Sequence, residues 1–509
     1  MELLHSIAAW VEDDSLDSPN VYWLFGPAGS GKSTIAFTIA NRFDTAGVGA
    51  NTATLGGNFF CSRQFEETKQ SRRIVRTIAY HLSLACTQFA YALSRSIPFD
   101  SAYHDVDSQL QNLLVKPWKA SARDRAADPS SPPYHLVIID ALDELDGKGG
   151  SEFLRILFTV LNKGELPGLK FFATSRPDPA LVSEVYSFET KRLYRLQDVG
   201  REGVTDDIRI YLTSRLPHFA KRQEIGILAA AADGLFIHAS TLVRYLERYQ
   251  PSEQEMLLTR FLVTYPSFMP RRSEKDVTSL DGLYFQILDT TFDGMEEYIL
   301  NNRLRILYTF LCMIGRTSTP LVAALLGTSV DAVDAVIDGL HAVLYTDNGQ
   351  VLLYHKSFSD FLFHRSRSGK YWCDQAVHNQ FLAECCFRIM MTGLKFNLAN
   401  IPSSFILDLD NPTLPVETAR CLPPVLSYSC QNWAHYLCFS APSLSQSLLD
   451  ILTEFFQISA LFWIEAMNLL GLVLQCSSIL QEVGEWVWDV SITFVRFLLS
   501  NLHSSLIPL

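Results

Sequence analysis

One short stretch of this chain carries glycines, a lysine and hydroxyl side chains at spacings that suit phosphate binding. It reads Phe25-Gly26-Pro27-Ala28-Gly29-Ser30-Gly31-Lys32-Ser33-Thr34 and fits the P-loop pattern Gly-x-x-x-x-Gly-Lys-Ser/Thr. The glycines allow the backbone to curl until successive N–H groups point at one spot, and a following helix adds its positive N-terminal end. The residues from Gly26 to Thr34 are therefore the predicted nucleotide-binding residues.

Two side chains of this stretch have individual predicted roles. Lys32 can reach the β- and γ-phosphates, and the Ser33 hydroxyl can ligate Mg²⁺. The alternative is a glycine-rich turn that binds nothing. The flanks favour the P-loop, because Val21–Phe25 is an apolar, strand-like run and Ser33–Phe43 has a helical pattern.

A second group of candidate residues follows an apolar run about 110 residues further along the chain. Leu136–Ile139 has the composition of a strand that is buried on both faces of a parallel sheet. Asp140 ends that run, at the edge of the sheet where ligands bind, and is placed to hold Mg²⁺. Of Asp143 and Glu144, one can polarise the attacking water and the other can complete the second shell of the metal. With the P-loop upstream, this pattern indicates a Walker B motif.

A third candidate follows the next apolar run, Leu169–Ser175, which also reads as a buried strand. Arg176 comes directly after it, where a cation can sense the γ-phosphate. The alternative is an arginine held by a neighbouring carboxylate.

The composition limits the possible functions. Hydrophobic residues make up 48% of the chain and charged residues 19%, which indicates a globular protein. The length of 509 residues predicts about three or four domains. The formal net charge of −12 argues against a generic nucleic-acid or membrane-surface binder. The ten cysteines are scattered without a C-x-x-C pair, so no zinc site is expected. The sequence instead predicts reduced thiols in a cytoplasmic protein. The N-terminus lacks signal-peptide features. The uncharged run Ala466–Gln481 is shorter than a bilayer span, so no transmembrane segment is expected.

The elements that would position these residues form an α/β unit. Strands are predicted at 21–25, 56–61, 136–139, 169–175 and 192–196, and helices at 1–12, 33–43, 72–84, 109–118 and 153–162. The polar, proline-containing segment Ala120–Pro133 reads as a surface loop. From Gly203 the strand signal stops, and helices are predicted at 204–216, 222–232 and 235–249.

The remaining chain is predicted to contain a winged helix followed by helices only. Three short helices at 302–314, 319–326 and 329–340 precede two strands at 343–346 and 351–354, and Asp347-Asn348-Gly349 between the strands is a hairpin signal. The segment SVDAVDAVIDGL at 329–340 carries three aspartates and no lysine or arginine, so phosphate would repel it and DNA binding is rejected. Residues 375–509 read as helices whose aromatics serve packing: Trp433, Tyr436, Phe439, Phe455, Phe456, Phe462, Trp463, Trp486 and Trp488.

Several motifs together resemble those of fungal NACHT proteins, which are signal-transducing NTPases of the STAND class and of the NOD-like receptor type. The motifs are GPAGSGKST, LVIIDALDE, FFATSRPD, GLFIHAS and YHKSFSDFL, and the resemblance covers residues 5–370. A small residue after the Walker B aspartate, here Ala141, is characteristic of NACHT. The resemblance implies an N-terminal helix and connector (1–20), a P-loop NTPase domain (21–198), a helical lid (199–298), a winged helix (299–368) and an α-helical C-terminal region (369–509).

The resemblance also implies a nucleotide-dependent switch. ADP or GDP would hold the core closed, and exchange for ATP or GTP would open it for self-association and signalling through an unknown effector protein, in self/non-self recognition or cell death. His355 lies in a motif like the one whose histidine contacts the β-phosphate in related switches. Gly234-Leu235-Phe236 has phenylalanine where plant and apoptotic relatives have a proline that contacts the nucleoside. Neither an effector domain nor a C-terminal repeat array is visible in this sequence.

The sequence is also compatible with two other functions. One is an enzyme with sustained turnover, a P-loop ATPase or a kinase, although no acceptor motif for a kinase is visible. The other is a scaffold that binds nucleotide weakly or not at all. A switch predicts slow ATP or GTP hydrolysis and a retained diphosphate, and the intact Lys32, Ser33, Asp140 and Glu144 count against the scaffold.

Overall fold

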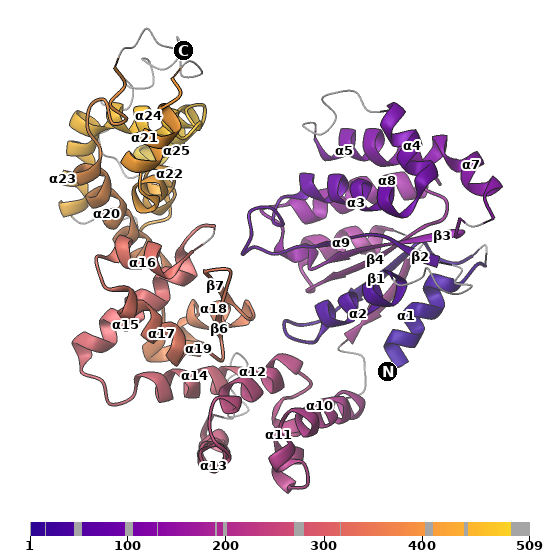
Figure 1. The fold of residues 1–509 in the computed structure, drawn as a ribbon. Helices are drawn as coiled ribbons and strands as arrows, with labels where there is room; N and C mark the ends of the chain where they lie inside the picture. Colours follow the sequence, from indigo (N-terminus) through magenta and orange to yellow (C-terminus); the bar gives the residue numbers. More distant parts are fainter. Residues whose placement is uncertain are drawn as a thin grey trace. The chain divides into compact units, whose positions relative to one another are not determined.

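Figure 1 shows the computed structural model of the chain, which divides into two compact units, Met1–Arg260 and Phe261–Leu509. The structure describes residues 2–15, 17–44, 53–96, 105–129, 131–188, 191–196, 201–268, 279–315, 317–402, 411–441 and 446–489. The last part of the predicted helical region, residues 490–509, lies outside them.

The first unit is built on a five-stranded parallel sheet with the order β2-β3-β4-β1-β5. The strands are β1 (Val21–Phe25), β2 (Ala53–Phe60), β3 (Tyr134–Asp140), β4 (Leu169–Ser175) and β5 (Lys191–Arg195). Side chains of β1 and β4 are buried throughout, because helices cover both faces. The predicted α/β sheet is therefore confirmed, with strand bounds within a few residues of those expected.

The two faces of the sheet have separate cores. Tyr22, Leu24 and Phe172 pack on one face with α1 (Glu2–Glu12) and α2 (Lys32–Asp44). The alternate residues of the same strands pack on the other face with helices that include α3 (Ser71–Ala85) and α8 (Gly149–Asn162). Figure 1 shows α1 and α2 on one side of the sheet and α3 and α8 on the other.

The segment between α3 and β3 differs from the prediction. Instead of one helix at 109–118, the chain forms α5 (Val106–Gln109), a π-helical turn at Leu110–Val115 and α6 (Lys116–Ala120). The predicted loop contains α7 (Ala122–Ala127). Arg125 of α7 lies 3.3 Å from the centre of the Trp118 ring and donates to the Trp118 carbonyl seven residues earlier, so this contact ties α7 to α6.

Helices follow the sheet in the first unit, as predicted. They are α10 (Arg201–Arg215), α11 (Gln223–Ala231), α12 (Phe236–Glu247) and α13 (Pro251–Phe268), which continues past the end of the unit. In this unit, besides α7, the helices α4 (Thr87–Ser96), α9 (Pro179–Ser187) and α13 had no predicted counterpart.

The second unit begins with helices and one hairpin. Its first elements are α14 (Ser279–Phe292), α15 (Glu297–Cys312), α16 (Thr319–Leu326), α17 (Val330–Gly339), β6 (Leu344–Asp347) and β7 (Gln350–Leu353). β6 and β7 pair antiparallel with Asp347 opposite Gln350. Asn348 and Gly349 between them have φ of 48° and 76°, as a two-residue type I′ turn requires, so the predicted hairpin is confirmed.

The C-terminal part of this unit is helical in the described residues. It contains α18 (Ser357–Leu362), α19 (Arg365–Ser368), α20 (Gln375–Gly393), α21 (Leu414–Cys421), α22 (Pro424–Cys438), α23 (Gln446–Glu454), a π-helical turn (Phe455–Ser459), α24 (Ala460–Leu469) and α25 (Gln475–Asp489). Trp433 is fully buried and contacts the rings of Phe387, Phe455 and Trp463, so these aromatics do form a core. Phe439 is an exception, with 57% of its surface exposed.

The uncharged run Ala466–Gln481 is not one helix, because the chain turns between α24 and α25. Among the described residues, no helix has the length and apolar character needed to cross a membrane. All ten cysteines are free thiols.

Candidate functional site

The P-loop lies between β1 and α2, as predicted. Phe25 ends the strand and Lys32 begins the helix. Gly29 and Gly31 have φ of +76° and +89°, a left-handed conformation that residues with a Cβ rarely adopt. The glycines of the pattern therefore shape the loop, and they leave the positive end of α2 at its centre.

Lys32 is directed back into this loop. Its side chain is buried, and its Nζ donates to the carbonyl oxygens of Gly26 and Pro27, both at 2.8 Å. Burial lowers the pKa of Lys32 to about 8, and the Asp143 carboxylate is the largest influence in the opposite direction. The ammonium group is thus held beside the loop by carbonyl groups and by a nearby acid.

Asp140 lies at the end of β3, and β4 separates this strand from β1. Asp140 is buried, which raises the pKa of its carboxyl group, while hydrogen bonds from the Ser33 and Thr174 hydroxyls lower it. Thr174 Oγ1 donates to Asp140 Oδ1 at 2.5 Å and accepts from Ala141 N at 3.0 Å. The two predicted metal ligands, Ser33 and Asp140, are therefore brought together, and β4 contributes Thr174 between the strands.

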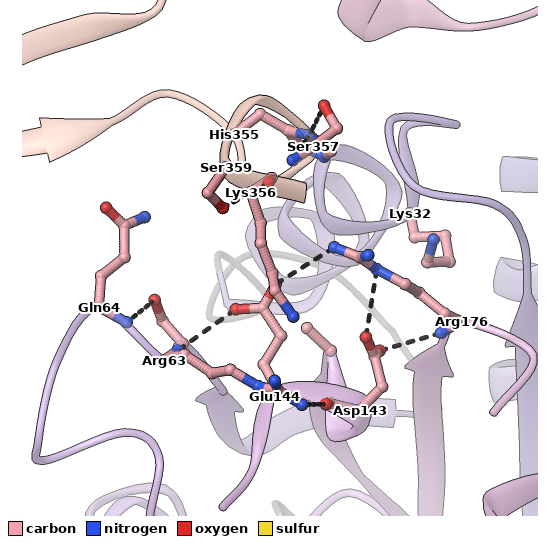
Figure 2. A network of polar contacts seen from close by, with 12 residues as sticks. Lys32, Arg63, Gln64, Asp143, Glu144, Arg176, His355, Lys356, Ser357 and Ser359 are labelled. Carbon is pink, nitrogen blue, oxygen red and sulfur yellow. Dashed lines mark hydrogen bonds and ion pairs between the residues drawn. The ribbon is translucent and has the colours of Figure 1, made fainter. Parts of the chain in front are cut away.

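Asp143 and Arg176 form a closely held pair. Asp143 Oδ1 accepts from Arg176 N at 2.9 Å, and Asp143 Oδ2 lies 3.3 Å from Arg176 Nε (Figure 2). Both oxygens of this carboxylate are thus engaged by one residue. Glu144 Oε1 lies further away, 3.9 Å from Arg176 Nη2. The three predicted catalytic residues therefore form one cluster, in which Arg176 contacts both carboxylates. Whether Arg176 also senses a γ-phosphate stays a prediction.

Arg63 belongs to the same cluster and was not predicted. It follows β2, the neighbour of β3 in the sheet, and contacts both acids of the turn after β3 (Figure 2). The rule used for Asp140 and Arg176, applied to the loop after β2 as a whole, could have found it, since the loops that follow parallel strands meet at one edge of the sheet.

Helix α12 provides a further contact with the P-loop within the first unit. Ile237 N donates to Gly29 O at 3.1 Å. A Cβ added to Gly29 would lie 2.0 Å from Ile237 Cγ2, and one added to Gly31 would lie 3.8 Å from Phe236. The start of α12, in the GLFIHAS motif, is therefore packed directly on the phosphate-binding loop.

His355 is the one predicted site residue in the second unit. Its Nδ1 accepts from Ser357 N at 3.1 Å and lies 2.7 Å from Ser357 Oγ, which also contacts the Tyr284 hydroxyl at 2.7 Å. These bonds fix the histidine ring within its own unit. Its role toward a nucleotide stays a prediction.

The sheet order, the P-loop after β1 and the acidic residues after β3 define the first unit as a P-loop NTPase type of fold. A family model described as "Nephrocystin 3, N-terminal" matches residues 4–176, a range that contains the P-loop, the acidic turn and Arg176. No curated protein matches the chain.

Solved structures show distant similarity. A signal transduction ATPase with numerous domains (STAND) from Pyrococcus horikoshii, with a tetratricopeptide repeat sensor, is 11% identical, with a TM-score of 0.36 over 99% of this chain and 67% of that one. A Walker-type ATPase of Pyrococcus abyssi is 12% identical, with a TM-score of 0.33 over 70% of this chain and 94% of that one. Drosophila ORC bound to DNA is 11% identical, with a TM-score of 0.31 over 67% of this chain and 80% of that one. Identities this low carry no information on ligands or partners.

Proposed function

We propose that this chain is a nucleotide-dependent switch of the NACHT/STAND class, which binds ATP/ADP or GTP/GDP with Mg²⁺ and hydrolyses the triphosphate slowly. The observation that carries the proposal is the meeting, at one edge of the sheet, of a P-loop with a buried lysine and an acidic turn held by arginines. The P-loop N–H groups and Lys32 would hold the phosphates.

The donor set suits magnesium. Ser33 and Asp140 offer a hydroxyl and a carboxylate oxygen, the hard ligands that Mg²⁺ prefers beside phosphate groups. A bound Mg²⁺ would supply charge stabilisation at the transferred phosphoryl group. Thr174 would keep the Asp140 carboxylate in place through its hydrogen bond.

The contacts of the acidic turn separate the roles of its two carboxylates. Asp143 is engaged through both oxygens by Arg176, which suits a positioning residue. Glu144 has the looser contact with Arg176, so it is the better candidate for orienting the attacking water. Arg176 would sense the γ-phosphate from the end of β4.

The switch character is supported by the packing of α12 on the P-loop. If phosphate binding shifts the loop at Gly29, the shift would displace Ile237, which packs on Gly29, and with it the helices that follow the sheet. In this proposal residues 199–298 are the lid, and residues 299–368 are a winged helix whose His355 contacts the diphosphate. The exposed Asp331, Asp334 and Asp338 of α17 support the exclusion of nucleic acid as a partner.

The exchange of diphosphate for triphosphate would then permit self-association and signalling to an effector protein. Because the motifs resemble those of fungal NACHT proteins, we propose that this signalling would serve self/non-self recognition or cell death.

The experiment that tests it is to purify the chain, denature it and identify any released nucleotide by chromatography. Near-stoichiometric ADP or GDP is the expected result and would also identify the base. An empty protein that turns over added ATP rapidly would favour an ordinary ATPase instead. An empty protein that binds neither ATP nor GTP would favour a scaffold.

A further inference from the structure

The loop after β2 runs alongside the acidic turn and contacts it at successive points. Cys61 N donates to Asp140 O at 3.0 Å, which extends the hydrogen bonding between β2 and β3 to their ends. Arg63 N then donates to Glu144 Oε2 at 3.3 Å, and Arg63 Nη2 donates to the main-chain oxygen of Asp143 at 2.7 Å (Figure 2). Arg63 therefore contacts the turn through its main chain and its side chain together.

The two arginines of the cluster act on different groups. Arg176, from β4, engages the Asp143 carboxylate through both of its oxygens. Arg63, from the β2 side, engages the Glu144 carboxylate and the peptide carbonyl that precedes Glu144. The acidic turn is thus held between two neighbouring strands, and the carboxylate assigned to water activation is the one that contacts Arg63.

We propose that Arg63 is a positioning residue for nucleotide hydrolysis, which holds the turn Leu142–Glu144 so that the Glu144 carboxylate keeps one orientation. This inference rests on the proposed function. The guanidinium bond to the Asp143 carbonyl limits rotation of the peptide that carries Glu144, and the main-chain bond fixes one carboxylate oxygen. Arg63 itself does not touch the phosphates in this assignment.

The first test compares single-turnover ATP and GTP hydrolysis by the full chain and its Arg63 variants. Arg63→Ala should lower the rate constant by about three- to tenfold, since it removes one charge-assisted bond at an exposed position, while KM changes by less than about twofold. Arg63→Lys keeps a cationic donor and should restore most of the rate. Arg123→Ala removes an exposed arginine from α7 in the same unit and should leave the rate unchanged.

The second test asks whether Arg63 acts through Glu144. Adding Arg63→Ala to a Glu144→Gln variant should cause no further loss, because the group that Arg63 positions is already disabled. If Arg63→Ala lowers the rate constant equally in the unchanged chain and in Glu144→Gln, the inference is overturned. It is also overturned if Arg63→Ala alone hydrolyses as fast as the unchanged chain.

Other outcomes would contradict the proposed function itself and not only the role of Arg63. Glu144→Gln turning over as fast as the unchanged chain would overturn the water-activating role of Glu144 and the inference with it. A chain that hydrolyses neither ATP nor GTP in a single turnover would also overturn both the role of Glu144 and the inference on Arg63. A slow Glu144→Gln variant beside an unaffected Arg63→Ala variant would leave the function standing and remove only the positioning role.

Discussion

The contact between Gly29 and Ile237 offers a direct test of how the P-loop is joined to the helices after the sheet. Gly29→Ala adds one methyl group at a position with φ of +76°, and that group would lie 2.0 Å from Ile237 Cγ2 and 2.7 Å from its Cβ. Both atoms are close to the backbone of a β-branched side chain, so Ile237 cannot rotate away at low cost. We expect the start of α12 to detach from the loop.

The magnitude has two parts. A left-handed conformation costs a residue with a Cβ about 1–2 kcal/mol, and overpacking a close contact costs about 1–3 kcal/mol more. The sum is about 2–5 kcal/mol, and its lower end corresponds to an increase of about thirtyfold in an opening equilibrium.

The assay is hydrogen exchange measured by mass spectrometry on peptides from β1 and α12, which reports opening segment by segment. Gly164→Ala is the matched control, because Gly164 has φ of +64° and a Cβ added there would meet nothing within 4 Å. The difference between the two variants therefore contains the overlap with Ile237 together with the local backbone strain at Gly29. Ile237→Ala combined with Gly29→Ala should recover about 1–3 kcal/mol of that difference.

Two results would refute this reasoning. If α12 exchanges at the same rate in Gly29→Ala as in Gly164→Ala, the loop and the helix are not in the contact described. If Ile237→Ala gives no recovery in the double variant, the damage arises within the loop itself, and the proposed route from phosphate to lid loses its support.

Further predictions concern the lysine, the acid and the buried histidines. Lys32→Ala should weaken nucleotide binding by about ten- to a hundredfold, since a charge-assisted contact is worth about 1.5–3 kcal/mol, as equilibrium dialysis would measure. Glu144→Gln should retain affinity for ATP or GTP but slow hydrolysis, as single-turnover assays would measure. Burial lowers the pKa of His135, His238 and His378 to about 4, so the unfolded chain binds more protons below pH 6.5 and stability should fall from there towards pH 4. The loss approaches about 3 kcal/mol per histidine, and urea unfolding at stepped pH would detect it.

Each of these expectations has a contrary outcome. Unchanged affinity in Lys32→Ala would defeat the assignment of the phosphate site. Equal hydrolysis by Glu144→Gln would move water activation to Asp143 or elsewhere. A His135→Gln variant whose stability falls as steeply as that of the unchanged chain between pH 6.5 and 4 would show that this histidine does not contribute.

The sequence predicted those features whose signals are local. The P-loop could be recognised because its glycines, Lys32 and Ser33 are contiguous and flanked by a strand and a helix. Asp140 and Arg176 could be placed because each directly follows an apolar run of strand length. Asn348-Gly349 predicted the hairpin, because both residues tolerate positive φ.

The features that the sequence did not predict depend on neighbours far apart in the chain. Nothing in the local sequence says that β4 lies between β1 and β3, so the bridging role of Thr174 was not visible. Arg63 acquires its contacts only because β2 pairs with β3. Likewise, the packing of Ile237 on Gly29 depends on how helices after the sheet return to its edge.

Ala141 shows how these contacts act together on the acidic turn. It has φ of 55°, a left-handed conformation that costs a residue with a Cβ about 1–2 kcal/mol. Its N–H is held by Thr174, and the turn that follows is held by Arg63 and Arg176 on either side. Strain of this kind persists only where surrounding contacts determine the conformation. The chain leaves β3 through Ala141 in a bend that turns Asp143 and Glu144 back towards the strand ends on either side. In the proposed site, the strained residue is therefore what allows one turn to present a metal-side aspartate, a positioning carboxylate and a water-activating carboxylate within five residues.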